Sequence, residues 1–435
     1  MTTLRLPLLL ALGLTLGAHP LAAQSASSRA PACAPDNAGI TLPAGFCALV
    51  VADSLGPIRH LVVAQNGDLF VALRRGRDSA ARGGLIALRD TSGDGVADVR
   101  RRFGPEQGGS GIALHRGYLY FGTDDAVIRW AWRAGQLEPA GPPDTVARDL
   151  TNRRQHASKG IAIGSDGALY VNIGAPSNAC QVADRQPASP GQDPCPLLEV
   201  AAGVWRFDPG KPGQTQADGI RFATGLRNTM ALAVEPSSGV LFAAQHGRDL
   251  LKGNWPELYT DEQSAEQPAE ELLRLERGGD YGWPYCYYDL ELKQKVQGPE
   301  YGGDGKTVGR CARARGPEIA FPGHWAPNGL AFYSGTQFPA SYRGGAFIAF
   351  HGSWNRAPLP QAGFNVTFVP FKNGRAVGRH TVFADGFIGA GREGGDALHR
   401  PTGLAVGPDG SLYLTDDRGG RLYRIMYASR RLPPR

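Results

Sequence analysis

The 435-residue chain lacks several patterns that mark common functional classes. It has no Cys-x-x-Cys-His motif, which excludes a covalently attached c-type haem, and no cysteine and histidine cluster with zinc spacing. No lysine and arginine run alternates with aromatic residues, so the net charge of +6 does not indicate a nucleic-acid partner. After the N-terminal segment no stretch approaches ~18 uninterrupted apolar residues, so we predict no stable membrane insertion.

The N-terminal segment has the pattern of a secretion signal. Arg5 precedes an apolar run from Leu6 to Gly17, and Ala22 and Ala23 offer small residues for a signal peptidase. The predicted organisation is a signal peptide (1–23), a flexible lead-in (24–37), one main domain (38–427) and a basic tail (428–435). The predicted location of the mature chain is periplasmic or secreted.

The six cysteines fall into three neighbouring pairs, and in an exported chain this spacing favours local disulfides. The local pairing joins Cys33 with Cys47, Cys180 with Cys195, and Cys286 with Cys311. Six cysteines can pair in many other ways, and the sequence does not choose among them.

A short phrase recurs six times: two runs of alternating apolar residues that flank a turn rich in glycine, aspartate or serine. The copies begin at Leu61, Gly111, Gly160, Ala231, Gly329 and Gly403. Each copy predicts a half-buried antiparallel hairpin. Their starts lie about 49 to 98 residues apart, which leaves room for a four-stranded sheet in each. The sequence therefore predicts an all-β fold, a six-bladed β-propeller with loop and helical excursions on one face.

A propeller gathers loops from all blades around one axial pocket, so polar residues beside the hairpins are the candidate site. These are His156 before the third hairpin, Arg227 and Asn228 before the fourth, Gln245–Asp249 after it, and Arg400 before the sixth. A histidine among arginines suits an anionic cofactor and a general base. The alternative is that these side chains cap blade edges and bond neighbouring carbonyls.

Several motifs in order support a family resemblance: HASKGIAIGSDGALYVNIG, FATGLRNTMALAV, GDYGWPYC, PNGLAFYSG, HGSWNR and RPTGLAVGPDGSLYLTDD. Through them the chain resembles the soluble pyrroloquinoline quinone (PQQ)-dependent sugar dehydrogenases, and more closely their L-sorbosone dehydrogenase-like branch. The resemblance spans about 390 residues. It implies an exported oxidoreductase with PQQ and calcium that oxidises a sugar or sugar aldehyde. It also implies an external electron acceptor, either a cytochrome or a quinone.

The resemblance also implies roles for single residues. His156 matches the catalytic base, and Arg227 matches the arginine that faces the reacting quinone oxygen. Asn228 matches its neighbour against the cofactor, and Arg400 matches an arginine that pairs with cofactor carboxylates. Gly247 and Arg248 align with the loop whose main-chain carbonyls hold calcium.

The chain departs from the pattern of the classical glucose-oxidising members at four positions, one of which is Arg248 in place of a proline in the calcium-holding loop. Ala175 stands where the family has an aspartate that orients the base, Asn355 where it has a cofactor-binding lysine, and Thr402 where it has a second arginine. Lys159 could restore positive charge, as could Arg153, Arg154 and Arg356. Gln107 matches a glutamine on the substrate side.

Two further features have open alternatives. Asp90, Ser92, Asp94, Val96 and Asp98 follow the rhythm of a calcium-binding loop, although a polar hairpin turn explains the same residues. Trp283, Trp325 and Trp354 could form a wall for sugar stacking, or they could pack between blades.

The most helix-like stretch, Glu262–Glu271, is predicted as an excursion over the propeller face, and Cys286–Cys311 as a second excursion. Two other function classes stay open for this scaffold. One is a calcium-dependent lactonase-type hydrolase, which needs a carboxylate-rich axial metal site. The other is a non-catalytic propeller that binds glycans or a partner protein.

Overall fold

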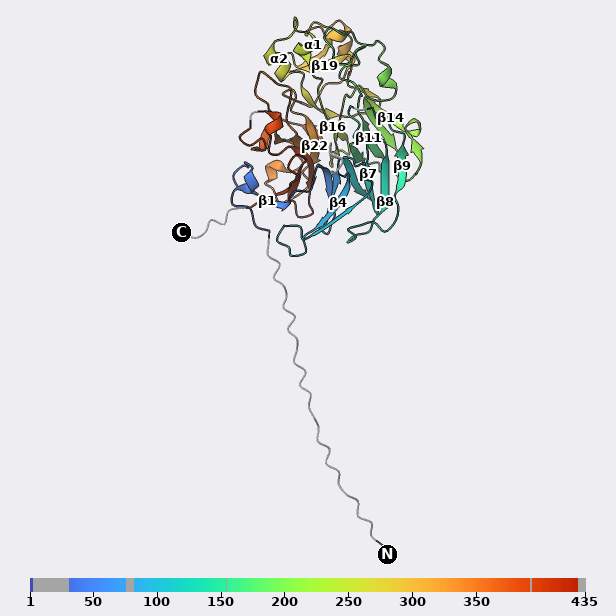
Figure 1. The fold of residues 1–435 in the computed structure, drawn as a ribbon, viewed down its shortest axis with the longest axis vertical. Coiled ribbons are helices and arrows are strands. Elements are labelled where there is room, and N and C mark those ends of the chain that lie inside the picture. Colours follow the sequence, from blue (N-terminus) through green and yellow to red (C-terminus); the bar gives the residue numbers. More distant parts are fainter. Residues whose placement is uncertain (3–30, 76–81, 154, 392, 429–435) are drawn as a thin grey trace, which may run out of the picture.

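Six sheets of four or five strands are arranged as a ring in the computed structural model (Figure 1). It describes residues 1–2, 31–75, 82–153, 155–391 and 393–428, so most of the predicted signal peptide, lead-in and tail lies outside the described residues. The innermost strands contact one another in chain order, and the last contacts the first. The prediction of a six-bladed β-propeller is confirmed.

The six copies of the repeated phrase form the two inner strands of each blade. All six pairs are antiparallel, as alternating apolar residues around a turn predict. From blade 1 to blade 6 they are β2 (Ile58–Val63) with β3 (Leu69–Leu73), β6 (Gly111–His115) with β7 (Tyr118–Gly122), β10 (Ile161–Ile163) with β11 (Leu169–Ile173), β15 (Ala231–Val234) with β16 (Leu241–Gln245), β22 (Pro327–Phe332) with β23 (Ala346–Phe350), and β28 (Pro401–Val406) with β29 (Leu412–Asp416).

Two outer strands complete each blade, and short elements lie on the connections. The outer strands of blades 1 to 5 are β4 (Gly84–Arg89) and β5 (Val99–Phe103), β8 (Val127–Ala131) and β9 (Asp144–Arg148), β12 (Gly203–Phe207) and β14 (Ile220–Thr224), β17 (Glu270–Arg274) and β21 (Ile319–Phe321), and β24 (Asn365–Val369) and β27 (Thr381–Ala384). The short strands are β13 (Gln214–Thr215), β18 (Gly279–Asp280), β19 (Cys286–Asp289), β20 (Gln294–Gln297), β25 (Phe371–Lys372) and β26 (Arg375–Ala376). The helices are α1 (Leu251–Asn254) and α2 (Asp261–Glu266), with 3-10 turns at Asn37–Gly39, Pro196–Glu199, Gln216–Asp218, Pro299–Tyr301, Gly309–Arg313, Ala340–Tyr342 and Gly394–Asp396.

Blade 6 joins the two ends of the chain. Its outermost strand β1 (Phe46–Ala52) pairs antiparallel with β30 (Leu422–Tyr427), so that Phe46 lies opposite Tyr427. The Phe46 ring packs edge-on against those of Phe338 and Phe383, at centroid distances of 4.8 and 5.0 Å. Phe46 therefore anchors the N-terminal strand to the apolar layer between blades 5 and 6.

Replacing Phe46 by alanine is expected to lower the free energy of unfolding by about 3–5 kcal/mol, because a buried aromatic side chain leaves a cavity that its neighbours fill only in part. Urea denaturation followed by tryptophan fluorescence measures the loss. Leu292→Ala is the control, because Leu292 is 43% exposed and its truncation should cost well under ~1 kcal/mol. Equal losses for both variants would contradict the anchoring role.

The three local disulfides are present: Cys33–Cys47, Cys180–Cys195 and Cys286–Cys311. The last encloses the β19–β20 hairpin, so the second excursion is cross-linked as predicted. The helix-like stretch is shorter than its composition suggested, because α2 ends at Glu266 and Glu270 begins β17. Pro268 accounts for the difference, since a residue before proline is disfavoured in helical conformation and Gln267 is extended.

Among the described residues, none of the helices combines the length and the hydropathy needed to cross a bilayer.

Candidate active site

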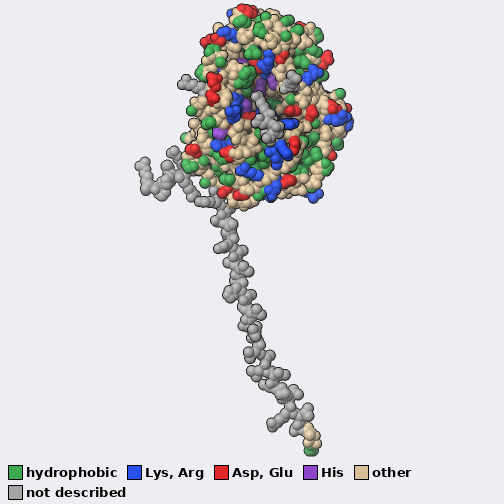
Figure 2. Space-filling view, viewed as in Figure 1, with side chains coloured by type: hydrophobic (Ala, Val, Ile, Leu, Met, Phe, Trp, Pro, Cys, Tyr) green, Lys and Arg blue, Asp and Glu red, His purple; other side chains and the backbone are tan. Residues whose placement is uncertain are grey.

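Loops from three blades enclose a cavity of about 160 Å³ that contains two of the predicted catalytic residues, His156 and Arg227. These loops precede an inner strand or follow its partner, so they meet at the same end of the ring. Figure 2 shows histidine side chains within a hollow of this surface. The lining residues are His156, Arg185, Arg227, His246, Gly247, Asp249, Glu270, His324, Ala326, Trp354 and Asn355.

The main chain, not a carboxylate, orients the imidazole of His156. Its Nδ1 lies 2.6 Å from the carbonyl oxygen of Ala175. Because a carbonyl only accepts, the proton sits on Nδ1 and Nε2 keeps its lone pair. Burial, followed by the charge of Arg227, lowers the pKa of His156 to about 3. The imidazole is therefore neutral at pH 7 and can accept a proton at Nε2.

Asp249 joins several groups of the cavity, a role that the sequence analysis did not predict. Its carboxylate accepts hydrogen bonds from Arg227 at 2.8 Å, Arg185 at 2.9 Å and Asn355 at 2.9 Å. Burial acts to raise its pKa, but Arg227 and His324 outweigh burial and hold the pKa of Asp249 well below its usual range. Asp249 stays ionised and fixes the Arg227 guanidinium, which also donates to the Gly247 carbonyl at 2.8 Å.

Two more ionisable groups border the cavity. The Nε2 of His246 donates to the Pro327 carbonyl at 2.9 Å, and burial lowers the pKa of His246 to about 4. Glu270 is buried, which raises its pKa to about 7, while its oxygens accept from the amides of Gly247 and Ala326 at 2.9 and 3.1 Å. Both side chains thus brace the loops of the cavity through main-chain groups.

Residues 40–428 match the TrAA12-like family. The chain belongs to the TrAA12-like family. A PQQ-dependent pyranose dehydrogenase of Coprinopsis cinerea is 23% identical over 438 residues, which cover 90% of this chain and 53% of that protein. The chain spans about half the length of the curated relatives it matches.

Two solved structures share the fold. The holo form of the pyranose dehydrogenase PQQ domain from Coprinopsis cinerea has a TM-score of 0.72 at 19% identity and covers 92% of this chain and 98% of its own. A calcium structure of Trichoderma reesei Carbohydrate-Active Enzymes Family AA12 has a TM-score of 0.72 at 19% identity, with coverages of 89% and 97%. The predicted resemblance to soluble PQQ-dependent sugar dehydrogenases is confirmed at the level of the family, and the L-sorbosone branch stays a prediction.

In this TrAA12-like protein Arg400 lies in a second polar cluster, outside the residues that line the His156 cavity. Its guanidinium donates to the carbonyls of Gly352 and Gly394 at 3.1 and 2.8 Å and to Nδ1 of His351 at 3.0 Å. Asp417 in turn accepts from Nε2 of His351 at 2.7 Å. A positive charge on His351 would lower the pKa of His246, so the two clusters are electrostatic neighbours.

The remaining predicted cofactor residues lie at different places. Asn355 lines the cavity, whereas Asn228 is buried beside it and accepts from the Asn172 amide at 3.2 Å. Gln107 is exposed and donates to Asp125 at 3.3 Å. Arg356 is buried in an ion pair with Glu266, and Arg154 lies outside the described residues.

Lys159 is wholly buried, and its ammonium group donates to the carbonyls of Thr151 at 2.9 Å and Ala157. It does not line the cavity. Lys159 thus fastens the loop that carries His156, because the two carbonyls lie on either side of that residue. Burial lowers the pKa of Lys159 to about 8.

The three predicted tryptophans do not form a common wall. Only Trp354 lines the cavity, where it is 65% exposed. Trp283 is buried against the Cys180–Cys195 disulfide, and its indole donates to the Asn178 carbonyl at 2.9 Å. Trp325 packs edge-on against Phe350. Packing within the fold therefore accounts for two of the three.

The predicted calcium residues are placed as follows. The Gly247 carbonyl faces Arg227, while the side chain of Arg248 turns away into a buried ion pair with Glu300 at 2.6 Å. In the other loop Asp90 accepts from the amide of Gly93 at 2.7 Å, and Asp98 from that of Thr91 at 2.7 Å. Within the described ranges no group of three or more His, Cys, Asp or Glu residues is arranged to hold a metal ion. Calcium at Gly247 and Arg248, or at Asp90, Ser92, Asp94, Val96 and Asp98, stays a prediction.

Proposed function

We propose that this chain is an exported PQQ-dependent oxidoreductase that oxidises a sugar or sugar aldehyde of the aldose or sorbosone type and passes the electrons to an external cytochrome or quinone. One observation carries the proposal: His156 presents an unprotonated Nε2 in the same cavity as the buried guanidinium of Arg227. A proton acceptor beside a fixed positive charge suits the oxidation of a hydroxyl group. The PQQ-dependent pyranose dehydrogenase that the chain resembles supports the cofactor.

The donor set fits a planar anionic cofactor. Two arginines, three histidines and the Asn355 amide face the cavity, against the carboxyl groups of Asp249 and Glu270. The cavity volume of about 160 Å³ is below the ~300 Å³ common for ligand pockets, so the cavity as it stands would hold only part of a three-ring group. Arg227, Arg185 and Asn355 would hold the cofactor, and Arg400 of the neighbouring cluster stays a predicted partner of the cofactor carboxylates. Calcium at the carbonyls of Gly247 and Arg248 stays a prediction, and it would require the Gly247 carbonyl to exchange its hydrogen bond from Arg227 for the ion.

The chemistry of the chain's own residues follows from their placement. When bound, PQQ supplies a quinone carbonyl that accepts the hydride of the substrate carbon. His156 takes the hydroxyl proton at Nε2, and the Ala175 carbonyl then stabilises the imidazolium through Nδ1. Arg227, held by Asp249, offers its positive charge to negative charge that develops on oxygen within the cavity.

Reconstitution tests the proposal. Apo-protein is titrated with PQQ and calcium chloride, and we expect a protein-bound quinone absorbance followed by dye reduction that depends on an added aldose or sorbosone. A bound chromophore that no sugar or aldehyde reduces would contradict the enzyme. Acid release from a lactone without any electron acceptor would favour the lactonase-type hydrolase. Glycan binding with no quinone binding would favour the non-catalytic propeller.

The pH dependence of the reconstituted enzyme is a further prediction. The active form of His156 is neutral, and its pKa of about 3 keeps it neutral at any higher pH. We therefore expect kcat/KM to show no acid limb from this group between about pH 5 and 8, whereas an unperturbed histidine would give one near ~6.5. Initial rates with a dye of pH-independent reduction measure the profile. Glu270 has a pKa of about 7 in the same cavity, so the profile is also measured with Glu270→Gln. An acid limb near pH 6.5 that persists when Glu270 and the other cavity histidines are replaced would contradict the assignment.

A further inference from the structure

Blades 3 and 6 share a charged arrangement at the turn between their inner strands. In blade 3, Tyr170 of β11 pairs with Arg206 of β12, and Asp166 stands four residues before the tyrosine. Arg206 donates to the Asp166 carboxylate through Nε at 3.0 Å and Nη2 at 2.9 Å, and the Tyr170 hydroxyl donates to it at 3.2 Å. The carboxylate of the turn thus satisfies the arginine of the third strand.

Blade 6 repeats this arrangement. Tyr413 of β29 pairs with Arg424 of β30, and Asp409 again stands four residues before the tyrosine. The Nη2 of Arg424 donates to Asp409 at 2.7 Å.

Blade 2 has the tyrosine and the arginine but reverses the charge of the turn. Tyr120 of β7 pairs with Arg129 of β8, and Arg116 stands four residues before Tyr120. This turn has two residues between the last paired residues, His115 and Tyr118, and both have positive φ: Arg116 (46°) and Gly117 (78°). Such two-residue turns favour Asn, Asp or Gly, so an arginine here costs backbone energy that its side chain does not recover in the turn itself.

Arg129 is therefore left without the carboxylate that its counterparts have. It is 7% exposed, and its Nε has no hydrogen-bond partner among the described residues. Its other nitrogens reach the Pro209 carbonyl and, at 3.5 Å, the carboxylate of Asp144, which is 57% exposed. A long ion pair to an exposed carboxylate contributes little, so the charge of Arg129 is balanced mainly by the Pro209 carbonyl and by the Tyr118 ring, whose centroid lies 4.2 Å from the guanidinium carbon.

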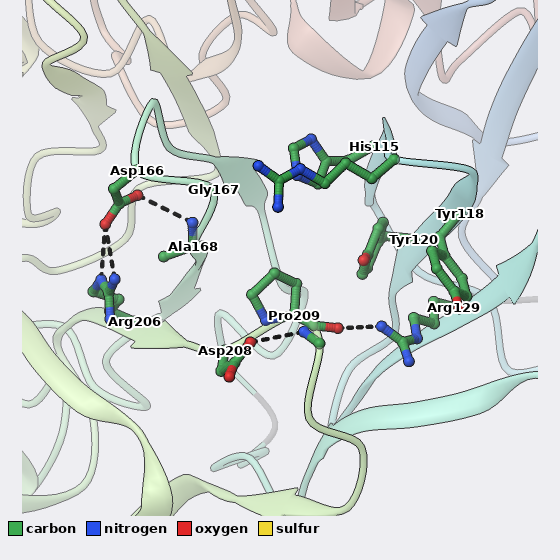
Figure 3. A pocket seen from close by; sticks show the side chains of 12 residues that line it. His115, Tyr118, Tyr120, Arg129, Asp166, Gly167, Ala168, Arg206, Asp208 and Pro209 are labelled. Carbon is green, nitrogen blue, oxygen red and sulfur yellow. Dashed lines mark hydrogen bonds and ion pairs between the residues drawn. The ribbon is translucent and has the colours of Figure 1, made fainter.

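A cavity lies beside Arg129 and the turn of blade 2. Figure 3 shows a cavity with Asp166 and Arg206 on one side and Tyr118, Tyr120 and Arg129 on the other. Its volume is about 410 Å³. Three arginines and two aspartates line it, and Asp166 is already engaged by Arg206. The lining residues are His115, Arg116, Tyr118, Tyr120, Arg129, Asp166, Gly167, Ala168, Arg206, Asp208, Pro209 and Gly210.

We propose that this cavity binds an organic carboxylate of the size of a sugar acid, whose carboxylate replaces the missing aspartate of blade 2. The guanidinium groups of Arg116 and Arg129 suit a planar carboxylate, as Arg206 and Arg424 show in their own blades. The phenol groups of Tyr118 and Tyr120 offer hydroxyl donors for the rest of a sugar. A volume of about 410 Å³ lies in the range of ligand pockets, ~300–1,000 Å³.

This site is separate from the proposed redox site. It is built on turns that join inner strands, whereas the His156 cavity is built on loops at the other ends of those strands. Binding at this site therefore requires no bound quinone, and its failure would leave the proposed oxidoreductase untouched.

Titration calorimetry with the whole chain tests the ligand class. We expect saturable binding of sodium D-glucuronate and at least about tenfold weaker binding of D-glucose and of inorganic phosphate. Trigalacturonate distinguishes two sources of the carboxylate, a free sugar acid and the acidic residue of a polysaccharide. A site for the polysaccharide residue binds trigalacturonate at least as tightly as it binds glucuronate. Equal binding of glucose, tighter binding of phosphate, or no saturable binding of either acid would overturn the proposal.

A charge-reversal variant tests whether the carboxylate binds in this cavity. Arg116→Asp supplies the turn carboxylate found in blades 3 and 6, so we expect glucuronate binding to fall at least about tenfold while the thermal midpoint does not decrease. Arg133→Asp is the matched control, because Arg133 is an exposed arginine of the same blade outside the cavity. Arg116→Ala serves if the first variant does not fold. Unchanged glucuronate binding in the folded Arg116 variant, or equal weakening by Arg133→Asp, would overturn the proposal.

Discussion

Replacing His156 by alanine is expected to lower kcat of the reconstituted enzyme by about a hundred- to ten-thousand-fold, the usual contribution of a general base. The substitution removes the imidazole but leaves the Cβ atom of residue 156 beside Gly174, so we expect the loop to keep its fold. The binding constant for PQQ should change far less than kcat, because the imidazole acts on the substrate proton. Dye-coupled initial rates and an absorbance titration measure the two quantities separately.

His380→Ala is the matched control for this prediction. His380 is a half-buried histidine that packs against Phe321, outside the cavity. Its removal should leave kcat within about twofold of the native value, since surface and peripheral substitutions rarely reach the chemistry. Full turnover in the folded His156 variant would show that another group takes the proton.

Replacing Asp249 by alanine is expected to cost both stability and activity. It leaves the Arg227 guanidinium, whose side chain is 4% exposed, without its counter-charge, and such a loss destabilises a protein by about 3–5 kcal/mol. Arg227 would also lose the carboxylate that fixes its position, so kcat/KM should fall. Urea unfolding of the apo-protein and dye-coupled kinetics of the reconstituted protein measure the two effects.

Asp261→Ala is the control for Asp249. Asp261 pairs with Lys252 where both side chains are exposed, at 40% and 37%, so its loss should cost no more than about 1 kcal/mol. Asp249→Asn keeps the shape of the side chain and removes only its charge. Native stability and native kcat/KM in both Asp249 variants would contradict the view that its charge holds Arg227.

The ring of inner hairpins could be predicted because its cause is local. Alternating apolar residues around a turn such as Asp166–Gly167 specify a half-buried strand pair without reference to the rest of the chain. The outer strands have no such signal: the β5 residues Val99–Phe103 include three arginines, and neighbouring strands decide their pairing. The predicted helix extends beyond the end of α2 for a related reason, since the helix-favouring composition of the stretch was given more weight than the effect of Pro268.

The candidate site could be predicted in part. The order of the motifs predicted that His156 and Arg227 belong to one site, and the structure places both in one cavity. The partner of His156 is a main-chain carbonyl, which any residue at position 175 would supply, so no sequence pattern identifies it. The sequence predicts that Lys159 supplies positive charge to the cofactor. Its burial under the His156 loop could not be predicted, because it depends on the folded arrangement of that loop. Asp249 stood within a motif already noted, yet its partners come from three separate loops.

The pairing of β1 with β30 makes the assembly of this protein depend on the whole chain. Strand β1 leaves the ribosome early, but its partner is synthesised only after about 370 further residues. Until then the edge of Phe46–Ala52 that pairs with β30 has no native neighbour, and until Pro401 is synthesised blade 6 lacks three of its four strands. Contacts of such long sequence separation form slowly. The growing chain therefore exposes an unpaired strand edge throughout its synthesis, which makes that edge a natural target for a holding chaperone.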